Sequence, residues 1–272
     1  MSKSRMAMQA LLAFGTAVLA ILIALRNPPS PATGHTSPGS GSFFDTVASR
    51  YDLINRIISL GMDTEWRRSA VDAALPAASV LDVSTGTGSL ALAVAQRSPR
   101  TRVVGIDPSR EMLALGLVKV AAGGKQFEKV HLQEAVAENL PFEDESFDAV
   151  VVAFGVRNFQ RRDKGIGEMI RVLKVGGRLV VLELSTPAGK GVKDTVARLF
   201  INKAMPKIAS LVSGNPAAYQ YLSESMAKFP TSERFVEILR NSGLTMKAHR
   251  RLSPFGLGPD LYTAVKSSQS GR

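Results

Sequence analysis

The chain has 272 residues, of which 45% are hydrophobic, enough for one large domain or two small ones around a substantial core. It contains no cysteine, which excludes disulfides, thiolate metal sites and cysteine nucleophiles. The net charge of +11 favours an anionic neighbour, and because only 6% of residues are aromatic and no arginine-rich tract is present, a membrane surface is a better candidate than nucleic acid.

Residues 1–26 predict an N-terminal hydrophobic segment. Residues 6–25 carry no charge, and as a helix they would span about 30 Å, close to the hydrocarbon thickness of a bilayer. Lys3 and Arg5 precede this run, a pattern shared by membrane anchors and by targeting leaders that are later removed. We expect an uncleaved anchor, with a removed leader as the alternative.

Residues 27–42 predict a flexible linker, because proline, glycine and serine dominate them and no apolar period survives. His35 lies in this linker, and His131 and His249 lie far along the chain, so a multi-histidine metal centre is not expected. One folded domain is expected over residues 43–272, with FFDTVASRYD as its first segment.

Short runs rich in β-branched residues alternate with helical patterns from Ser79 onward. The runs are ASVLDV, RVVGID, FDAVVVAF and GRLVVLEL, and two further strands, LTMKAHRRL and DLYTAVK, follow near the C-terminus. Strands that alternate with helices indicate right-handed crossovers and a parallel sheet covered on both faces. The expected fold class is therefore α/β.

The segment STGTGS follows the first of these strands, at the place where open α/β sheets bind ligands. Gly86 and Gly88 allow a tight turn and a close backbone approach, and the next helix offers free N–H groups at its start. Asp107 ends the following strand, 19 residues after Gly88, a spacing typical of an acidic residue that binds both hydroxyls of an adenosine ribose.

This bend alone leaves the cofactor open between NAD and S-adenosylmethionine. Ala91 stands where pyrophosphate-binding loops carry a third glycine, and alanine is tolerated there. Asp82 also lies in this region, and its carboxylate suits the ammonium and sulfonium charges of S-adenosylmethionine better than a pyrophosphate. The sequence therefore favours S-adenosylmethionine.

Five segments resemble the ubiquinone/menaquinone biosynthesis C-methyltransferases. They are FFDTVASRYDLINRIISLGMDTEWRR, DVSTGTGS, AENLPFEDESFDAVVVAFGVRNF, EMIRVLKVGGRLVVLELSTP and YQYLSESMAKFP, and the resemblance covers residues 43–266. It implies a Rossmann-like class I methyltransferase sheet, mostly parallel with an antiparallel C-terminal strand and with helices on both faces. It also implies S-adenosylmethionine as cofactor and, as the lipid substrate, a prenylated quinol that is methylated on a ring carbon.

The resemblance further implies which residues bind the cofactor. Asp107 would hold the ribose, Met112 would flank the adenine, and the backbone N–H of Ala137 would meet the edge of the base. Two positions depart from the family pattern, because Val136 replaces a polar residue that bonds the adenine amino group and Ser89 replaces an aspartate. A lower cofactor affinity is expected, unless backbone and water contacts substitute. The methionine portion would contact Asp82, Ser84, Gly86 and Gly88.

Arg157 and Asn158 of FGVRN follow a strand at the place where the substrate should lie. Carbon methylation needs a nucleophilic ring carbon, which a quinol gains when a neighbouring hydroxyl loses its proton. The Arg157 guanidinium could stabilise that phenolate, or a water acting as base. The alternative is a structural role in which Arg157 pairs with Asp148 or Glu183 or caps a helix.

Two further residues are candidates for the substrate side, and two more for the cofactor side. Asp63 could act as a base, or it could cap a helix or pair with Arg67. Tyr219 could line the quinol pocket, with core packing as the alternative. Tyr51 and Asp52, in the opening helix, are expected to close over the cofactor.

Residues 187–230 predict a helical cover for the substrate. Apolar and basic positions recur at helical spacing over residues 191–214, which indicates a basic amphipathic surface. Such a surface suits an enzyme that collects a prenyl lipid from an anionic bilayer, and an ordinary lid helix explains the pattern equally well.

The leading hypothesis is a membrane-tethered quinol C-methyltransferase, with either a benzoquinol or a naphthoquinol as acceptor. The alternatives are a non-catalytic assembly subunit of a quinone-synthesising complex and, favoured by charge alone, an RNA methyltransferase. Other quinone-biosynthesis enzymes or a second copy of the chain are candidate partners. The catalytic domain is expected to face a compartment that contains the cofactor, which is the mitochondrial matrix, the plastid stroma or the cytoplasm.

Overall fold

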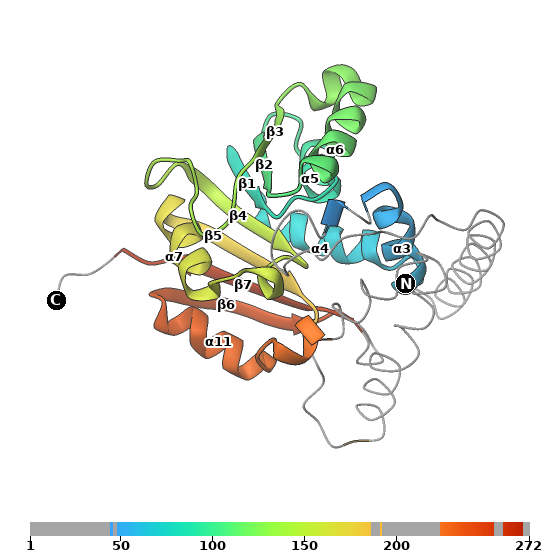
Figure 1. Cartoon of the computed structure of the whole chain (residues 1–272). Helices are drawn as coiled ribbons and strands as arrows, with labels where there is room; N and C mark the ends of the chain where they lie inside the picture. The colour runs from blue at the N-terminus through green and yellow to red at the C-terminus, as the bar shows by residue number, and fades with distance from the viewer. Residues whose placement is uncertain (1–43, 46–47, 186–190, 192–223, 253–257, 269–272) are drawn as a thin grey trace, which may run out of the picture.

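A computed structural model describes residues 44–45, 48–185, 191, 224–252 and 258–268 (Figure 1). Within these residues, seven strands form one sheet in the order β3-β2-β1-β4-β5-β7-β6. The strands are β1 (Ser79–Val83), β2 (Arg102–Asp107), β3 (Val130–Glu134), β4 (Phe147–Ala153), β5 (Leu173–Glu183), β6 (Leu244–Arg251) and β7 (Asp260–Lys266).

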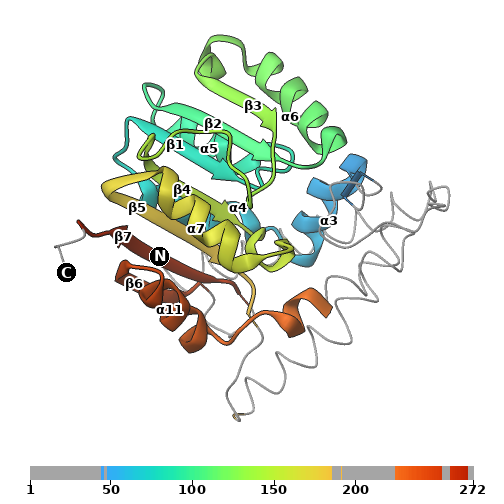
Figure 2. The same cartoon turned by 60° about the vertical axis from the view of Figure 1, so that its left-hand side comes forward.

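Helices cover both faces of this sheet (Figures 1 and 2). Two of them precede the first strand, and most of the others connect one strand to the next. The α-helices are α3 (Tyr51–Ile58), α4 (Asp63–Ala74), α5 (Ser89–Arg97), α6 (Arg110–Gly123), α7 (Arg162–Val172) and α11 (Ser232–Asn241), and short 3-10 helices lie at η1 (Ala48–Arg50), η2 (Gly124–Phe127) and η3 (Val156–Asn158).

The strand directions confirm the expected fold class. β1 pairs in parallel with β2 and β4, and the pairs β2–β3 and β4–β5 are parallel as well. β7 runs antiparallel between β5 and β6, which gives the antiparallel C-terminal strand that the family resemblance implies. The strand pattern of the sequence does not reveal β3, because this edge strand, VHLQE, is short and largely polar.

The two faces of the sheet have separate hydrophobic cores. Val80 of β1 packs on the face covered by α4 and α5, whereas its neighbour Leu81 packs on the face covered by α7 and α11. All five residues of β1 are buried, as expected for a central strand of a parallel sheet. Asp82 is the charged residue in this apolar run, and a buried charge needs a partner or a function.

The strand order reverses between β1 and β4, which are neighbours in the sheet although they are far apart in the sequence. The helices that follow these two strands, α5 and α7, pack on opposite faces. A crevice therefore opens beyond the carboxyl ends of β1 and β4, where ligands bind in folds of this kind.

Several predicted features lie outside the described residues. The hydrophobic segment at 1–26 and the linker at 27–42 are among them. Of the predicted substrate cover at 187–230, the structure describes Gly191 and residues 224–230, and residues 224–228 are helical. Among the described helices, none is both long and apolar enough to cross a membrane.

Candidate active site

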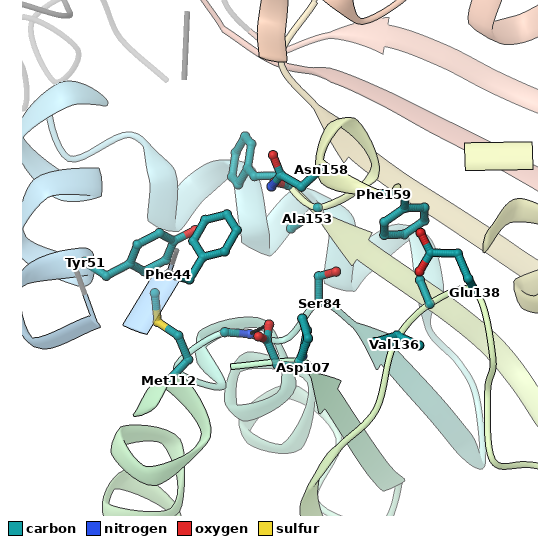
Figure 3. A pocket seen from close by; sticks show the side chains of 15 residues that line it. Phe44, Tyr51, Ser84, Asp107, Met112, Val136, Glu138, Ala153, Asn158 and Phe159 are labelled. Carbon is teal, nitrogen blue, oxygen red and sulfur yellow. Dashed lines mark hydrogen bonds between the residues drawn. The ribbon is translucent and has the colours of Figure 1, made fainter. Parts of the chain in front are cut away.

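A cleft occupies the crevice between β1 and β4, with about 610 Å³ of empty space when the part open to solvent is included. Segments distant in the sequence meet there: the opening helices, the bend after β1, the end of β2, the segment after β3 and the turn after β4. In Figure 3, one side of the cleft carries Phe44, Tyr51 and Met112, the opposite side carries Val136, Glu138 and Phe159, and Ser84 and Asp107 lie between them.

A smaller compartment adjoins this cleft beneath the bend. Arg67, Asp82 and Thr85 border it, and Tyr51 and Ser84 border both spaces. The larger space is thus adjacent to the residues expected to bind ribose and adenine, and the smaller one to the acid expected to bind the methionine portion.

The bend after β1 is held in left-handed backbone conformations. Ser84, Gly86 and Gly88 have φ angles of 57°, 56° and 76°. Glycine adopts such angles without strain, whereas serine does not, and a strained residue of this kind is common at ligand sites. Gly88 caps α5 and lies close to Leu132, so among the described residues it shapes the bend but does not border either space.

Asp82 is buried at the end of β1 with one oxygen satisfied and the other not. Its Oδ2 accepts hydrogen bonds from Thr85 Oγ1 at 2.6 Å and from the Ala91 backbone N–H at 3.0 Å. Its buried Oδ1 has no hydrogen-bond partner in the described part of the chain. Burial raises the pKa of Asp82 to about 7. A carboxylate in this state has an acceptor available for a cationic group.

Asp107 reaches back from the end of β2 to the bend. Its Oδ2 accepts the backbone N–H of Gly86 at 2.8 Å, and its Oδ1 accepts that of Ser109 at 2.9 Å. Burial raises the pKa of Asp107 to about 6, although these two N–H groups act in the opposite direction. Each carboxylate oxygen can accept more than one hydrogen bond, so the side chain is positioned to bind a pair of hydroxyls as well.

The adenine side of the cleft contains one residue that the sequence interpretation missed. Met112, Val136 and Ala137 line the cleft, and the Val136 residue is 43% exposed. Glu138 also lines it, and its Oε1 accepts the backbone N–H of Arg161 at 3.2 Å. Glu138 could have been predicted from the sequence, because it lies two residues after Val136, in the segment that is expected to lie beside the adenine.

Helix α3 is joined to the bend by an ion-pair network. Asp52 Oδ1 accepts the Thr87 hydroxyl at 2.7 Å, and Asp52 Oδ2 lies 2.5 Å from Lys119 Nζ of α6. Lys119 also donates to Thr87 Oγ1 at 2.8 Å. Tyr51, next to Asp52, borders both spaces, and the network joins its helix to the bend. Closure of Tyr51 and Asp52 over the cofactor stays a prediction.

Four aromatic side chains form a wall around the open part of the cleft: Phe44, Tyr51, Phe154 and Phe159. Phe154 has a φ of 61°, a strained angle for a bulky residue, and its ring lies 6.4 Å from that of Trp66. Asn158 lines the cleft beside it and donates to the Phe154 carbonyl at 3.3 Å. These residues line the cleft from opposite sides with apolar rings and one amide group.

The structure does not bring Arg157 or Asp63 into the cleft. The Arg157 guanidinium pairs with Glu183, and only 8% of its side chain is exposed, so the structural alternative describes its position. Asp63 pairs with Arg67 and accepts the Ser59 hydroxyl at 3.2 Å. Neither Arg157 nor Asp63 borders the cleft within the described residues. Tyr219 lies outside those residues, and the catalytic roles of all three stay predictions.

A sequence profile of the ubiE/COQ5 methyltransferase family matches residues 35–257. The chain belongs to this family. The demethylmenaquinone methyltransferase of Deinococcus radiodurans is 45% identical over 216 residues, which are 79% of this chain and 87% of that protein. Its namesake from Thermus thermophilus is 45% identical, with coverage of 75% and 92%. A ubiquinone/menaquinone biosynthesis C-methyltransferase, UbiE of Geotalea daltonii, is 43% identical, with coverage of 82% and 94%.

Solved structures share the fold of this family member at low sequence identity. Phosphoethanolamine N-methyltransferase 2 of Haemonchus contortus, in complex with S-adenosyl-L-methionine, gives a TM-score of 0.63 at 18% identity, with 86% of this chain and 61% of that chain covered. The [4+2]-cyclase SpnF gives 0.65 at 18% identity, with coverage of 88% and 99%. Because a cyclase has the same fold, the fold alone does not define the reaction.

As a member of this family, the chain is an S-adenosylmethionine-dependent methyltransferase, and the site fits that cofactor. The unpartnered Oδ1 of Asp82 suits a cationic group, Asp107 suits the ribose, and Met112 and Ala137 line the space beside them. The NAD alternative that the bend alone left open is thereby set aside. Contact with the cofactor stays a prediction for these four residues and for Ser84, Gly86 and Gly88.

Proposed function

We propose that this chain methylates a ring carbon of a prenylated quinol, and that the acceptor is a demethylmenaquinol. The names of the relatives support this proposal, since those from Deinococcus radiodurans and Thermus thermophilus are demethylmenaquinone methyltransferases. The name of the Geotalea daltonii relative covers both ubiquinone and menaquinone. None of these names favours an assembly subunit or an RNA methyltransferase.

The aromatic wall of the cleft is the observation in the structure that carries this proposal. Tyr51 and Phe154 border both the space beside Asp82 and the larger space that Phe44 and Phe159 help to line. A flat apolar ring can pack against these side chains at the point where the two spaces adjoin. An acceptor with an aromatic ring is therefore favoured over a small polar amine or a phosphate ester.

When bound, S-adenosylmethionine would supply an electrophilic methyl group to the ring carbon. The new carbon–carbon bond would form as the sulfur–methyl bond breaks, and the electron pair of that bond would stay on sulfur. The ring carbon would then lose its proton to solvent. The protein's part is to bind, orient and exclude water. The aromatic wall displaces water from the ring, and the Asn158 amide lies where a ring hydroxyl can be oriented. Positioning of this kind contributes up to about 7–11 kcal/mol in model reactions.

Arg157 supports this arrangement from behind the cleft. Its backbone N–H donates to Glu183 Oε2 at 3.2 Å, while its guanidinium pairs with the other oxygen of the same carboxylate. These contacts fix the turn η3 on the end of β5 and so set the position of Asn158. In this arrangement Arg157 is a positioning residue, and its charge is matched by Glu183.

The proposal includes attachment to the membrane that contains the lipid acceptor. Residues 6–25 carry no charge, the net charge of +11 suits an anionic bilayer, and the substrate has a prenyl tail that stays in the bilayer. The catalytic domain would face the compartment that supplies the cofactor. Carbonate extraction of membranes tests this: the full chain should stay with the membrane, and deletion of residues 1–42 should release it.

Methyl transfer from labelled S-adenosylmethionine tests the acceptor. The full chain in detergent would be offered a reduced demethylmenaquinol and a methoxy-polyprenyl-benzoquinol side by side. The expected result is labelled product from the naphthoquinol, with a much smaller amount from the benzoquinol. Product from the benzoquinol alone would overturn the choice of ring, and no product from either, although the cofactor binds, would overturn the quinol proposal.

A further inference from the structure

We propose that Arg67 binds the carboxylate of the methionine portion of S-adenosylmethionine, so that Arg67 and Asp82 together recognise the two opposite charges at that end of the cofactor. The inference concerns the cofactor and stands whichever quinol is the acceptor.

The position of Arg67 is the first step. Arg67 lies on α4 and borders the smaller compartment together with Asp82, Ser84 and Thr85. Only 13% of its side chain is exposed, and its guanidinium carbon lies 6.0 Å from the centre of the Phe154 ring. Arg67 is also close enough for its charge to oppose the rise that burial gives the pKa of Asp82. The guanidinium therefore faces the compartment and not bulk solvent.

The donors of this guanidinium are the second step. Asp63 pairs with its Nη1. Asp63 is in turn fixed by the Ser59 hydroxyl, which donates to the Asp63 carboxylate at 3.2 Å and accepts the Asp63 backbone N–H at 3.3 Å. Within the described residues, this ion pair is the one hydrogen-bonding interaction of the guanidinium. A guanidinium has five N–H donors in a fixed fork, so the others are available to an acceptor in the compartment.

The charges of the compartment are the third step. The methionine end of the cofactor carries an ammonium and a carboxylate on one carbon atom. Among the described residues that border the compartment, Arg67 is the one cation and Asp82 is the one carboxylate, and no described residue bonds to Asp82 Oδ1. Each charged group of the ligand thus meets a group of opposite charge, and Arg67 would share its charge between Asp63 and the ligand carboxylate, with separate N–H donors for each.

A purely structural role is the competing explanation for Arg67. In that case the whole role of the Arg67 side chain would be its ion pair with Asp63, which lies four residues earlier on the same helix. The two explanations differ in one respect: only carboxylate recognition makes Arg67 sensitive to whether the ligand has a carboxylate.

Calorimetric titration of Arg67→Met with three ligands tests this difference. S-adenosylmethionine has both charges, decarboxylated S-adenosylmethionine lacks the carboxylate, and 5′-methylthioadenosine lacks the amino acid portion. The affinity for S-adenosylmethionine should fall about ten- to a hundredfold, as for a lost hydrogen bond between charged groups. The affinities for the other two ligands should change less than about twofold, because neither has the group that Arg67 binds.

The matched control is Arg68→Met, which changes the neighbouring arginine, whose side chain is 68% exposed. It should alter none of the three affinities. Arg67→Lys covers the case in which the methionine variant does not fold, because lysine keeps a cation for Asp63 but lacks the guanidinium fork. The affinity of Arg67→Lys should still fall more for S-adenosylmethionine than for the decarboxylated analogue.

Two results would overturn the proposal. One is an unchanged affinity of Arg67→Met for S-adenosylmethionine. The other is an equal loss for all three ligands, which would mean that the substitution only damages the compartment. Failure of methyl transfer to every quinol, with this ligand selectivity intact, would count against the proposed acceptor alone.

Discussion

Two buried aspartates, Asp82 and Asp260, lie in different halves of the sheet and have opposite surroundings. Each residue is 1% exposed. Asp82, at the end of β1, keeps one oxygen without a described partner, and burial raises its pKa to about 7. Asp260, at the start of β7, has both oxygens bonded by guanidinium, imidazole and hydroxyl groups, namely those of Arg251, His249, Ser185 and Ser232.

The pKa of Asp260 differs accordingly. Burial alone would raise it, but the hydrogen bonds from Arg251 and Ser185 and the charge of Arg251 hold it below its ordinary value. The carboxylate of Asp260 is thus satisfied by the chain itself, whereas Asp82 Oδ1 has no partner in the described part of the chain, and we expect a ligand to supply one. The comparison teaches that burial of a carboxylate does not by itself indicate a site, and that incomplete bonding of a buried carboxylate does.

The largest effect is expected from Asp260→Asn. Loss of the carboxylate leaves Arg251 without its counter-charge in a mostly buried position, and breaking such a pair typically destabilises by about 3–5 kcal/mol. Because the Arg251 side chain is 25% exposed, we expect about 3 kcal/mol, the low end of that range. Denaturant unfolding at neutral pH measures it, and the affinity for S-adenosylmethionine should stay the same.

Asp72→Asn is the control for that experiment. Asp72 pairs with Arg97, and their side chains are 48% and 63% exposed, so the loss should be below about 1 kcal/mol. A loss of cofactor affinity in Asp260→Asn, without a loss of stability, would reverse the roles that the comparison assigns.

Asp82→Asn is expected to have the opposite pair of effects. The affinity for S-adenosylmethionine should fall about ten- to a hundredfold, because a hydrogen bond to a charged group is lost. The cofactor-free protein should become more stable at pH 8, because a buried carboxylate with an unsatisfied oxygen is replaced by a neutral amide. Calorimetric titration and thermal unfolding of the cofactor-free protein measure the two effects.

The pH dependence of that stability gain follows from the raised pKa. Asp82 in the folded protein ionises near pH 7, whereas the unfolded chain ionises near the ordinary value of 3.8. Ionisation of Asp82 therefore does not lower the free energy of unfolding below pH 3.8. The loss of stability grows as the pH rises from 3.8 to 7, and it stays constant above pH 7. The advantage of Asp82→Asn should follow the same course, and a variant less stable than the original chain at pH 8 would contradict the assignment.

Cofactor binding should itself depend on pH, with the sign fixed by the same raised pKa values. Asp82 and Asp107 must be ionised to bind an ammonium and a pair of hydroxyls, and burial raises their pKa values to about 7 and about 6. The affinity for S-adenosylmethionine should fall up to about tenfold per pH unit below pH 7, and more steeply below pH 6. In Asp82→Asn only the step near pH 6 should remain, and an unchanged profile would exclude Asp82 as its source.

The sequence predicts the parts of this site that depend on local spacing. Asp82 and Asp107 end two neighbouring parallel strands, and Gly86 lies in the turn between the first strand and its helix, so their convergence follows once the strands are recognised. The antiparallel strand came from the family resemblance and not from the strand pattern itself. The sequence does not reveal the edge strand β3 because it has only five residues, three of which are polar.

Other residues depend on contacts that spacing does not determine. Glu183 lies 26 residues after Arg157, and no periodicity tells which way the guanidinium turns once the strand has ended. The same holds for Arg67, which reaches the cofactor compartment from a helix that precedes the sheet. Phe44 and Phe159 line one cleft although they are distant in the sequence. Such convergence is a property of the tertiary fold, and the sequence showed it only where the family resemblance pointed to it.

The smallest effect is expected at Asp52, which combines features of both aspartates in the comparison. Like Asp260 it is satisfied by the chain, through Lys119 and Thr87, but its position is beside the cofactor cleft and its side chain is 45% exposed. Exposed ion pairs contribute about 0.2–1 kcal/mol, so Lys119→Met should weaken cofactor binding no more than about fivefold. It should do so by loosening α3, which carries Tyr51, and the weakening should shrink as salt screens the ion pair.

The matched control is Lys125→Met, which changes an exposed lysine beyond α6 and should leave cofactor binding unchanged at any salt concentration. A hundredfold loss in Lys119→Met would mean that Asp52 behaves like Asp82, as a carboxylate that the ligand itself completes, and the distinction between self-satisfied and ligand-satisfied carboxylates would then not hold in this cleft.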